Sequence, residues 1–451
     1  MVPGQPGIDQ NEPVHARASR IAIAIAVAVG GLSAAPLSPT AAQTTTTSAP
    51  AISPTDYVDQ ALGVIERHSF TAATVDMAGI RASAMAKAAT AASIADTYPL
   101  IEAAIKATGD RHASFRRPVA QTLLTQGRYE GYGFVAVWPT RVVITVTLGG
   151  PAALGGLRVG DRIEKIDGKS PPHNSREIVL KKDANGRFAE SVTLTVRRAS
   201  SKKALKMRLI RGEPTLVSIP TAQTAPTPAG SPIAGRIGYV ELPGLVGDKS
   251  AQTSYAQQTQ ELLRNLDQTP RCGWVVDLRR NRGGYIAAML AGIGPLIGDG
   301  DLATRVRADG TRVVWSYHQG EVRQGDDVEV AVPNAYVAAV AAPRPVAVLT
   351  SALTASAAEA TALAFAGRPN ARLFGEPTVG LTSYTVLAVL PDGASITVTN
   401  ALDADATGKT HDGPIPPDER VSVDWNNVGT PNDPVLSAGV RWLTNQPGCA
   451  V

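Results

Sequence analysis

Cysteine is scarce in this sequence of 451 residues, which contains only Cys272 and Cys449. A cysteine-rich zinc or iron–sulfur module is therefore excluded, and at most one internal disulfide can form. A strong charge bias is also missing, because 43 Lys and Arg residues are balanced by 39 Asp and Glu residues for a formal net charge of +4. This balance is too weak to imply a nucleic-acid partner.

Residues 21–35 form an uncharged apolar stretch that is too short to be a typical membrane span. As a helix it would be about 22 Å long, whereas the hydrocarbon core of a bilayer is about 30 Å thick. Two arginines precede it, and small residues at 40–42 follow it. This pattern predicts a cleaved signal peptide over residues 1–42 and a linker over 43–55, with the mature protein in the periplasm, cell envelope or extracellular space. The alternative is an uncleaved anchor or a buried helix, and only an uncleaved segment would keep the chain at the membrane.

Export also changes what the two cysteines predict, because oxidising compartments allow thiols to pair. Cys272 stands just before an apolar run, and Cys449 is third from the end. A bridge between them would tie the carboxyl-terminal tail to the core and stabilise the fold by at most about 5 kcal/mol. The alternative is two unpaired buried thiols.

The spacing of apolar residues divides the chain into regions of different structure. Residues 56–118 consist mostly of helix formers with apolar positions three and four apart, which predicts a helical region. Residues 119–212 have short alternating runs separated by glycine turns, which predicts a β-rich module. After a linker over 213–234, strand-like and helical runs alternate over 235–451, which predicts an α/β layered domain. The expected fold class is therefore α+β, with several domains.

Individual elements are predicted within these regions. In the β-rich module the expected strands are 142–146, 162–166 and 191–196. In the last domain the expected strands are 237–242, 274–278, 345–350 and 372–374, with helices over 250–266, from 285 onward and after 356.

Glycine turns in the β-rich module follow an ordered pattern, with Gly149-Gly150, Gly160-Asp161 and Asp167-Gly168 after the segment Gly131-Tyr132-Gly133-Phe134. This order resembles that of PDZ domains. The resemblance implies a groove beside an exposed strand that takes an extended peptide, usually its C-terminus, with the loop of Gly131, Tyr132, Gly133 and Phe134 receiving the carboxylate. The alternative is a small β-barrel with ordinary glycine turns. A basic run within residues 197–211 is better explained by a solvated strand pair than by nucleic-acid binding.

Two segments of the last domain carry residue types that suit acyl transfer. Gly283 and Gly284 follow an apolar strand and precede a helix, so their backbone N–H groups suit an oxyanion or a phosphate. Ser356 lies between another apolar strand and a helix, where the positive helix end favours a developing negative charge. Taken singly, a Gly-Gly pair is commonly only a turn, and a serine at the start of a helix is commonly only its N-cap.

Together with residues 374–380 and 413–418, these segments resemble the C-terminal processing peptidases, also called tail-specific proteases. The core fold of that family is shared with the tricorn protease and interphotoreceptor retinoid-binding protein, so the resemblance implies a crotonase-like core of ββα repeats. The site residues that it implies are a nucleophile, Ser356, and oxyanion-hole donors on Ala357 and on Gly283 or Gly284.

The resemblance fails at the usual base. Many family members use a lysine in a Gly-Lys pair, but here Gly380 is followed by Leu381. The only lysines after Glu213 are Lys249 and Lys409, and neither lies in one of these motifs. A serine–lysine dyad is therefore not expected.

Among the six histidines, His112 lies in the sequence Thr-Gly-Asp-Arg-His-Ala-Ser-Phe. This segment resembles one in relatives that use serine with histidine, such as the nisin-resistance peptidases, which implies that His112 is the general base. An imidazole with a pKa near 6.5 can accept the serine proton at neutral pH and return it to the leaving amine. The alternative is a structural cap of this loop, with His318 and His411 as other candidate bases. Asp110 and Asp412 are candidates for orienting His112.

These features together predict an exported serine endopeptidase that hydrolyses peptide bonds of unfolded proteins or peptides, with Ser356 as nucleophile and His112 as base. The PDZ module would capture or gate protein and peptide substrates, including their C-termini, and no metal or other cofactor is needed. The alternative is a catalytically inactive peptide- or ligand-binding protein on the same scaffold. The sequence does not specify an oligomeric state.

Overall fold

The structure, a computed structural model, describes residues 52–450 apart from 174–176, 179, 181–186, 199, 202, 216–218, 229–230, 232 and 338–343. The predicted signal peptide over residues 1–42 and most of the first predicted linker lie outside the described residues. Within the described part of the chain, no helix is long and apolar enough to cross a membrane.

Three helices form the amino-terminal region: α1 (Pro54–His68), α2 (Met77–Ala88) and α3 (Ile94–Ala107). Their N-caps Ser53, Asp76 and Ser93 accept hydrogen bonds from N–H groups of the first turn, which have no partner within the helix. The apolar faces of these helices enclose a core with Ile396 and Val398, which come from a distant strand. The shorter elements of this region are η1 (Ala72–Thr74), β1 (Ser114–Arg116) and α4 (Pro118–Thr125).

The β-rich module is a five-stranded antiparallel sheet in the order β2-β3-β4-β5-β6. Its elements are β2 (Phe134–Val137), β3 (Val142–Val146), α5 (Pro151–Leu154), β4 (Arg162–Ile166), β5 (Ser191–Arg197) and β6 (Leu205–Ile210). Two of the predicted turn glycines, Gly149 and Gly168, have φ of 70° and 78°, a conformation that favours glycine. The three strands predicted in this module are confirmed.

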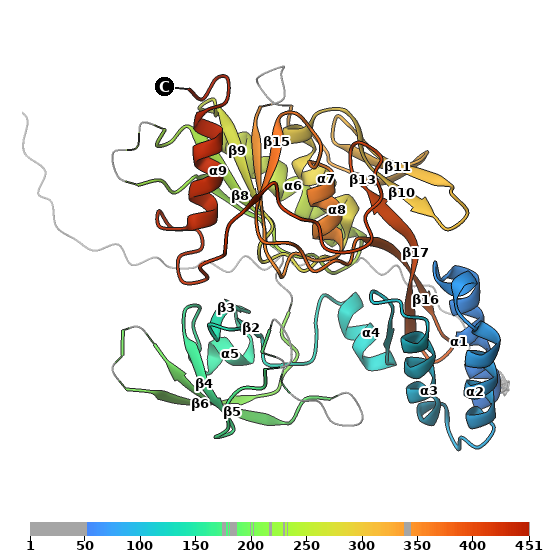
Figure 1. The fold of residues 1–451 in the computed structure, drawn as a ribbon. Helices are drawn as coiled ribbons and strands as arrows, with labels where there is room; N and C mark the ends of the chain where they lie inside the picture. Colours follow the sequence, from blue (N-terminus) through green and yellow to red (C-terminus); the bar gives the residue numbers. More distant parts are fainter. Residues whose placement is uncertain are drawn as a thin grey trace, which may run out of the picture. The chain divides into compact units, whose positions relative to one another are not determined.

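A six-stranded sheet in the order β18-β15-β14-β9-β8-β7 forms the centre of the last domain, and its strands are parallel except for β7. The strands are β7 (Thr221–Thr224), β8 (Ile237–Glu241), β9 (Gly273–Asp277), β14 (Val346–Thr350), β15 (Ala371–Gly375) and β18 (Glu419–Arg420). One face packs against α6 (Lys249–Leu266), α7 (Ile286–Ile297) and α8 (Ala357–Leu363), and the other against α9 (Pro434–Thr444), as Figure 1 shows. The predicted α/β layers are confirmed, and so is the α+β multidomain fold class.

Strand β7 lies within residues 213–234, which the sequence predicts as a linker. It pairs antiparallel with β8 at the edge of the sheet, and Ala222 is partly buried against the core. A strand edge offers unpaired backbone groups, and pairing with it orders a segment whose own composition does not favour a strand.

A second sheet connects the amino-terminal region to the last domain. Its order is β1-β17-β10-β11-β12-β13, and β16 pairs with β17. Strand β17 pairs with β1 along one edge and with β16 along the other, so Thr397 lies between Ser114 and Leu387. The strands after β1 are β10 (Gly300–Arg307), β11 (Arg312–His318), β12 (Glu321–Gln324), β13 (Asp327–Ala331), β16 (Ser383–Val389) and β17 (Ser395–Ala404).

Cys272 and Cys449 form a disulfide, as the sequence predicts. Replacing both by serine is expected to lower the free energy of unfolding by about 2–4 kcal/mol, because the unfolded chain then gains the freedom of an open loop. Urea unfolding of the parent, with and without reductant, and of the double-serine variant would measure the change. Reductant should have no effect on the variant. The prediction is wrong if the parent and the variant unfold with the same free energy.

Candidate active site

Ser356 lies at a sharp turn between β14 and α8. Its backbone has φ 56° and ψ −123°, a conformation that costs free energy for a residue with a side chain and that recurs at strained nucleophile turns. The preceding loop is held to the end of β9, because the Ser351 hydroxyl donates to the Arg279 carbonyl at 2.7 Å and the Thr354 hydroxyl donates to the Leu278 carbonyl at 3.0 Å. These buried hydrogen bonds fix the position from which the Ser356 side chain projects.

Gly283 packs directly against Ser356. A Cβ added at Gly283 would lie 2.7 Å from the Ser356 Cβ and 2.8 Å from the Ala355 carbonyl oxygen, and φ is +97°. Only glycine fits this position. The Gly283 N–H donates to Asn281 Oδ1 at 2.8 Å. Among the described residues, the N–H groups of Gly284, which follows Gly283, and of Ala357, which follows Ser356, have no acceptor, so these two are the candidate oxyanion donors.

Glu359 fixes the backbone of Ser356. Its carboxylate accepts hydrogen bonds from the N–H groups of Ser356 at 2.9 Å, Gly380 at 2.7 Å and Leu381 at 2.8 Å, and from the Thr378 hydroxyl. Burial raises the pKa of Glu359, and the four hydrogen bonds act in the opposite direction. Through this carboxylate, Ser356 is attached to the segment 378–383.

A second buried carboxyl group, Asp403, lies near Glu359. Burial, and then the charge of Glu359, raise the pKa of Asp403 to about 7, against the opposing charge of Arg305. The surroundings of the candidate nucleophile therefore include a group that titrates near neutral pH.

His112 belongs to a chain of hydrogen bonds that ends at a carboxylate. Its Nδ1 is 2.9 Å from the Ser383 hydroxyl, which lies 3.2 Å from the Thr399 hydroxyl. The Thr399 hydroxyl donates to Asp110 Oδ1 at 2.8 Å. Asp110 also accepts hydrogen bonds from the N–H groups of His112 and Ala113, at 3.0 and 3.1 Å. Asp110 therefore holds the loop directly and reaches the His112 ring through two hydroxyls.

The carboxylate sets the direction of this chain. An ionised carboxylate only accepts hydrogen bonds, so the single Thr399 hydroxyl hydrogen points to Asp110. The contact between the two hydroxyls then uses the hydrogen of Ser383, whose oxygen is left to accept from His112 Nδ1. In this arrangement the proton of neutral His112 is on Nδ1, and Nε2 keeps its lone pair, as a general base requires.

Sequence reasoning missed Ser383 and Thr399. The only local signal was a set of hydroxyl residues after Gly380 and along residues 395–399, which is also common in exposed strands. Among the described residues, Asp412 makes no hydrogen bond to His112. The other candidate bases are engaged elsewhere, since His411 and His318 each lie 2.9 Å from an aspartate.

Burial lowers the pKa of His112 below its usual 6.5, and the charge of Arg116 acts in the same direction, while Asp110 and Ser383 oppose the shift. The imidazole is therefore neutral at neutral pH. Both His112 and Ser356 are attached to the segment 378–383: His112 through Ser383, and Ser356 through Glu359. The neighbouring Arg111 guanidinium also donates to the Gly380 carbonyl at 2.8 Å.

The predicted peptide-binding loop ends in β2, whose first residue is Phe134. Tyr132 is buried, and the Gly131 N–H donates to the Gly212 carbonyl at 2.9 Å. On the edge of β2 away from β3, the Ile178 N–H donates to the Ala136 carbonyl at 2.8 Å. That edge is therefore partly paired within the module.

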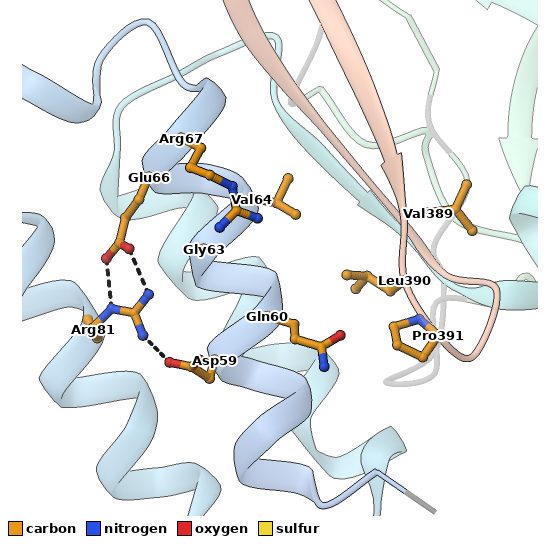
Figure 2. A pocket seen from close by; sticks show the side chains of 10 residues that line it. All are labelled: Asp59, Gln60, Gly63, Val64, Glu66, Arg67, Arg81, Val389, Leu390 and Pro391. Atoms are coloured by element: carbon orange, nitrogen blue, oxygen red, sulfur yellow. Dashed lines mark hydrogen bonds and ion pairs between the residues drawn. The ribbon is translucent and has the colours of Figure 1, made fainter. Parts of the chain in front are cut away.

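A pocket of about 490 Å³ lies between α1 and the β16–β17 hairpin (Figure 2). Arg81 forms ion pairs with Glu66, at 2.7 Å, and with Asp59, so these charges satisfy one another. Val389 and Leu390 from the hairpin line the pocket, which contains none of the candidate catalytic residues.

Comparison with known families matches two regions of the chain. Residues 236–421 match the model of peptidase family S41, and residues 142–198 match that of the PDZ domain. The first range includes Ser356 and the glycine pair, whereas His112 lies before both ranges.

Individual proteins are similar over larger parts of the chain. The nisin-resistance protein of Lactococcus lactis subsp. lactis is 30% identical over 215 residues, which cover 48% of this chain and 62% of that protein. The chloroplastic carboxyl-terminal-processing peptidase 2 of Arabidopsis thaliana is 27% identical over 347 residues, which cover 71% of this chain and 61% of that protein. This chain thus spans about 61–62% of the length of these two curated relatives.

Solved structures share the fold. The photosystem II D1 C-terminal processing protease aligns with a TM-score of 0.52 at 21% identity, covering 88% of this chain and 99% of that one. A lipoprotein from Streptococcus agalactiae aligns with a TM-score of 0.54 at 17% identity, covering 87% and 96% of the two chains. At these identities the likeness establishes the architecture alone.

Proposed function

Because residues 236–421 form a peptidase family S41 domain and residues 142–198 a PDZ domain, we propose that this protein is an exported serine endopeptidase. Ser356 is the nucleophile and His112 the general base in this proposal. The substrates are peptide bonds of unfolded proteins or peptides, which the PDZ domain captures or admits. The disulfide between Cys272 and Cys449 supports a location in an oxidising compartment outside the cytoplasm.

The observation that carries this proposal is the geometry around Ser356. The serine is held at a strained turn and Gly283 packs against it, while the N–H groups of the adjoining residues Gly284 and Ala357 have no acceptor among the described residues. In the proposed reaction, His112 Nε2 accepts the Ser356 proton as the hydroxyl oxygen attacks the peptide carbonyl. The two N–H groups stabilise the oxyanion, and the imidazolium returns the proton to the leaving amine. Water, from which His112 accepts a proton, then hydrolyses the acyl-enzyme.

Covalent labelling tests the proposal and separates it from an inactive binding protein on the same scaffold. The parent chain, residues 43–451, is treated with a serine-directed fluorophosphonate, and the modified residue is located by mass spectrometry. We expect one adduct on Ser356 and none in Ser356→Ala. Ser254→Ala, which removes an exposed hydroxyl on α6, should be labelled like the parent. A folded parent that does not react would contradict the proposal and favour the binding protein.

The pH dependence of cleavage should report His112. Because burial lowers the pKa of His112 and the base must be neutral, kcat/KM is expected to fall on the acidic side with a midpoint below 6.5. Replacing Ser383 by alanine removes the acceptor of Nδ1–H, so kcat should drop, by at most the roughly 10⁴-fold that follows when a catalytic histidine loses the partner that orients it. Ser383→Thr, which keeps the hydroxyl, should recover part of the rate.

Peptide cleavage followed from pH 4.5 to 9 for the parent, Ser383→Ala and Ser383→Thr would measure both effects. A midpoint near pH 7 that is the same in all three proteins would instead indicate Asp403, whose pKa is raised to about 7 by burial. That result would contradict the assignment of His112.

A further inference from the structure

Arg116 faces the same side of its sheet as His112. In the short strand β1, Ser114 lies opposite Thr397 and Arg116 lies opposite Ser395. Phe115 packs into the core of the amino-terminal helices, so its neighbours in the strand point to the other side. On that side the Arg116 guanidinium contacts Thr397, and the His112 ring contacts Ser383. Alternation along one strand thus brings a cation to the face that carries the candidate base.

The Arg116 guanidinium has no carboxylate partner among the described residues. Its Nη1 donates to the Thr397 hydroxyl at 3.0 Å, which is a neutral acceptor. Burial lowers the pKa of Arg116, an effect that only the nearby Tyr285 hydroxyl opposes. By contrast, the buried guanidinium of Arg279 is paired with aspartates. Arg116 itself is only partly buried, so its cation is partly desolvated, a cost that a ligand of opposite charge can offset.

Arg116 also lies within electrostatic reach of both sides of the candidate active site. Its charge contributes to the low pKa of His112, and Tyr285 acts on Arg116 in turn. Tyr285 directly follows Gly283 and Gly284 in the sequence. Only residues 114–116 are in a strand, so the four-residue step from His112 to Arg116 spans at most about 13 Å, the length of a fully extended chain. An extended substrate rises by about 3.3 Å per residue, so this limit corresponds to at most about four substrate residues.

We propose that Arg116 binds a carboxylate group of the substrate within about four residues of the scissile bond, and so acts as a specificity-determining residue. The inference rests on the proposed peptidase function. The carboxylate is either an Asp or Glu side chain or the terminal carboxylate of a chain cut near its end. A guanidinium binds both with the same paired N–H groups, and the distance to the scissile bond distinguishes them.

The test uses a peptide that the parent cleaves, synthesised in matched pairs. Each pair carries Glu or Gln at one of the four positions on either side of the cut, and a further pair ends in a free carboxylate or an amide. The ratio of kcat/KM within each pair is measured for the parent, Arg116→Gln and Arg116→Lys. The control is Arg117→Gln, which changes the next residue, an arginine 3.8 Å from Glu102.

We expect the parent to prefer the charged member of one pair by about 10- to 100-fold. Arg116→Gln should bring that ratio close to one, Arg116→Lys should leave an intermediate ratio, and Arg117→Gln should keep the parent ratio. If the parent prefers Glu over Gln at an internal position, the carboxylate bound by Arg116 is a side chain. If it prefers the free acid over the amide, the carboxylate is the chain terminus.

Two results overturn the inference and differ in what else they affect. If the parent cleaves both members of every pair equally, or if Arg116→Gln keeps the preference, Arg116 does not select the substrate, although the peptidase function stands. If the parent cleaves no peptide and Ser356 does not react with the fluorophosphonate, the proposed function fails and this inference fails with it.

Discussion

Replacing Ser356 or His112 by alanine is expected to lower kcat for peptide cleavage by roughly 10⁴- to 10⁶-fold. Ser356 supplies the attacking oxygen, and His112 must remove its proton, so neither residue can act without the other. The double variant should therefore be no slower than the slower single variant. The residual rate of cleavage should come from the oxyanion donors and substrate binding alone.

Purified parent and variants, incubated with an unfolded protein at pH 7.5 and analysed by mass spectrometry, would give these rates and the cleavage positions. His411→Ala is the matched control, because that ring is engaged by Asp405. It should cleave at nearly the parent rate. If His112→Ala retains cleavage and His411→Ala loses it, the base has been assigned to the wrong histidine.

Replacing Arg279 by methionine is expected to lower the free energy of unfolding by about 3–5 kcal/mol. The guanidinium is fully buried and bridges Asp277 at the end of β9 to Asp433, the N-cap of α9. Removing the cation leaves two buried carboxylates without a counterion. The Arg279 carbonyl also accepts a hydrogen bond from the Ser351 hydroxyl, in the loop that precedes Ser356. A shift of that loop should therefore reduce cleavage as well.

Urea unfolding at pH 7 would measure this change, with Arg323→Met as the control. Arg323 pairs with Glu321 at 2.8 Å on the surface, and its loss should change the free energy by less than about 1 kcal/mol. Equal effects of the two substitutions would contradict the prediction.

The sign of the pH dependence gives a further check on Arg279. Burial alone would raise the pKa of Asp277, but Arg279 holds it below the ordinary value of 3.8. The stabilisation is therefore complete above pH 3.8 and is lost as the pH falls through the lowered pKa. The difference between the parent and Arg279→Met should shrink over that range.

The sequence by itself determined the elements whose signal is local. Strands such as β3 and β9 and the helix α6 follow from the spacing of apolar residues, because a strand or helix needs its own buried face. Ser356 and the glycine pair were found because their residue types lie beside strand ends and helix starts. The partners of the disulfide could be predicted directly, since only two cysteines are present.

Tertiary structure alone decided how these residues are oriented. His112 and Ser383 are 271 positions apart, and Asp110 and Thr399 are 289 apart, yet the pairing of β17 with β1 and with β16 brings both pairs into contact. Similarly, only the fold packs Gly283, which follows β9, against Ser356, which follows β14. Hydrogen bonds between distant strands leave no periodic pattern in either segment. The sequence can therefore identify the residues of the site but not how they are oriented toward one another.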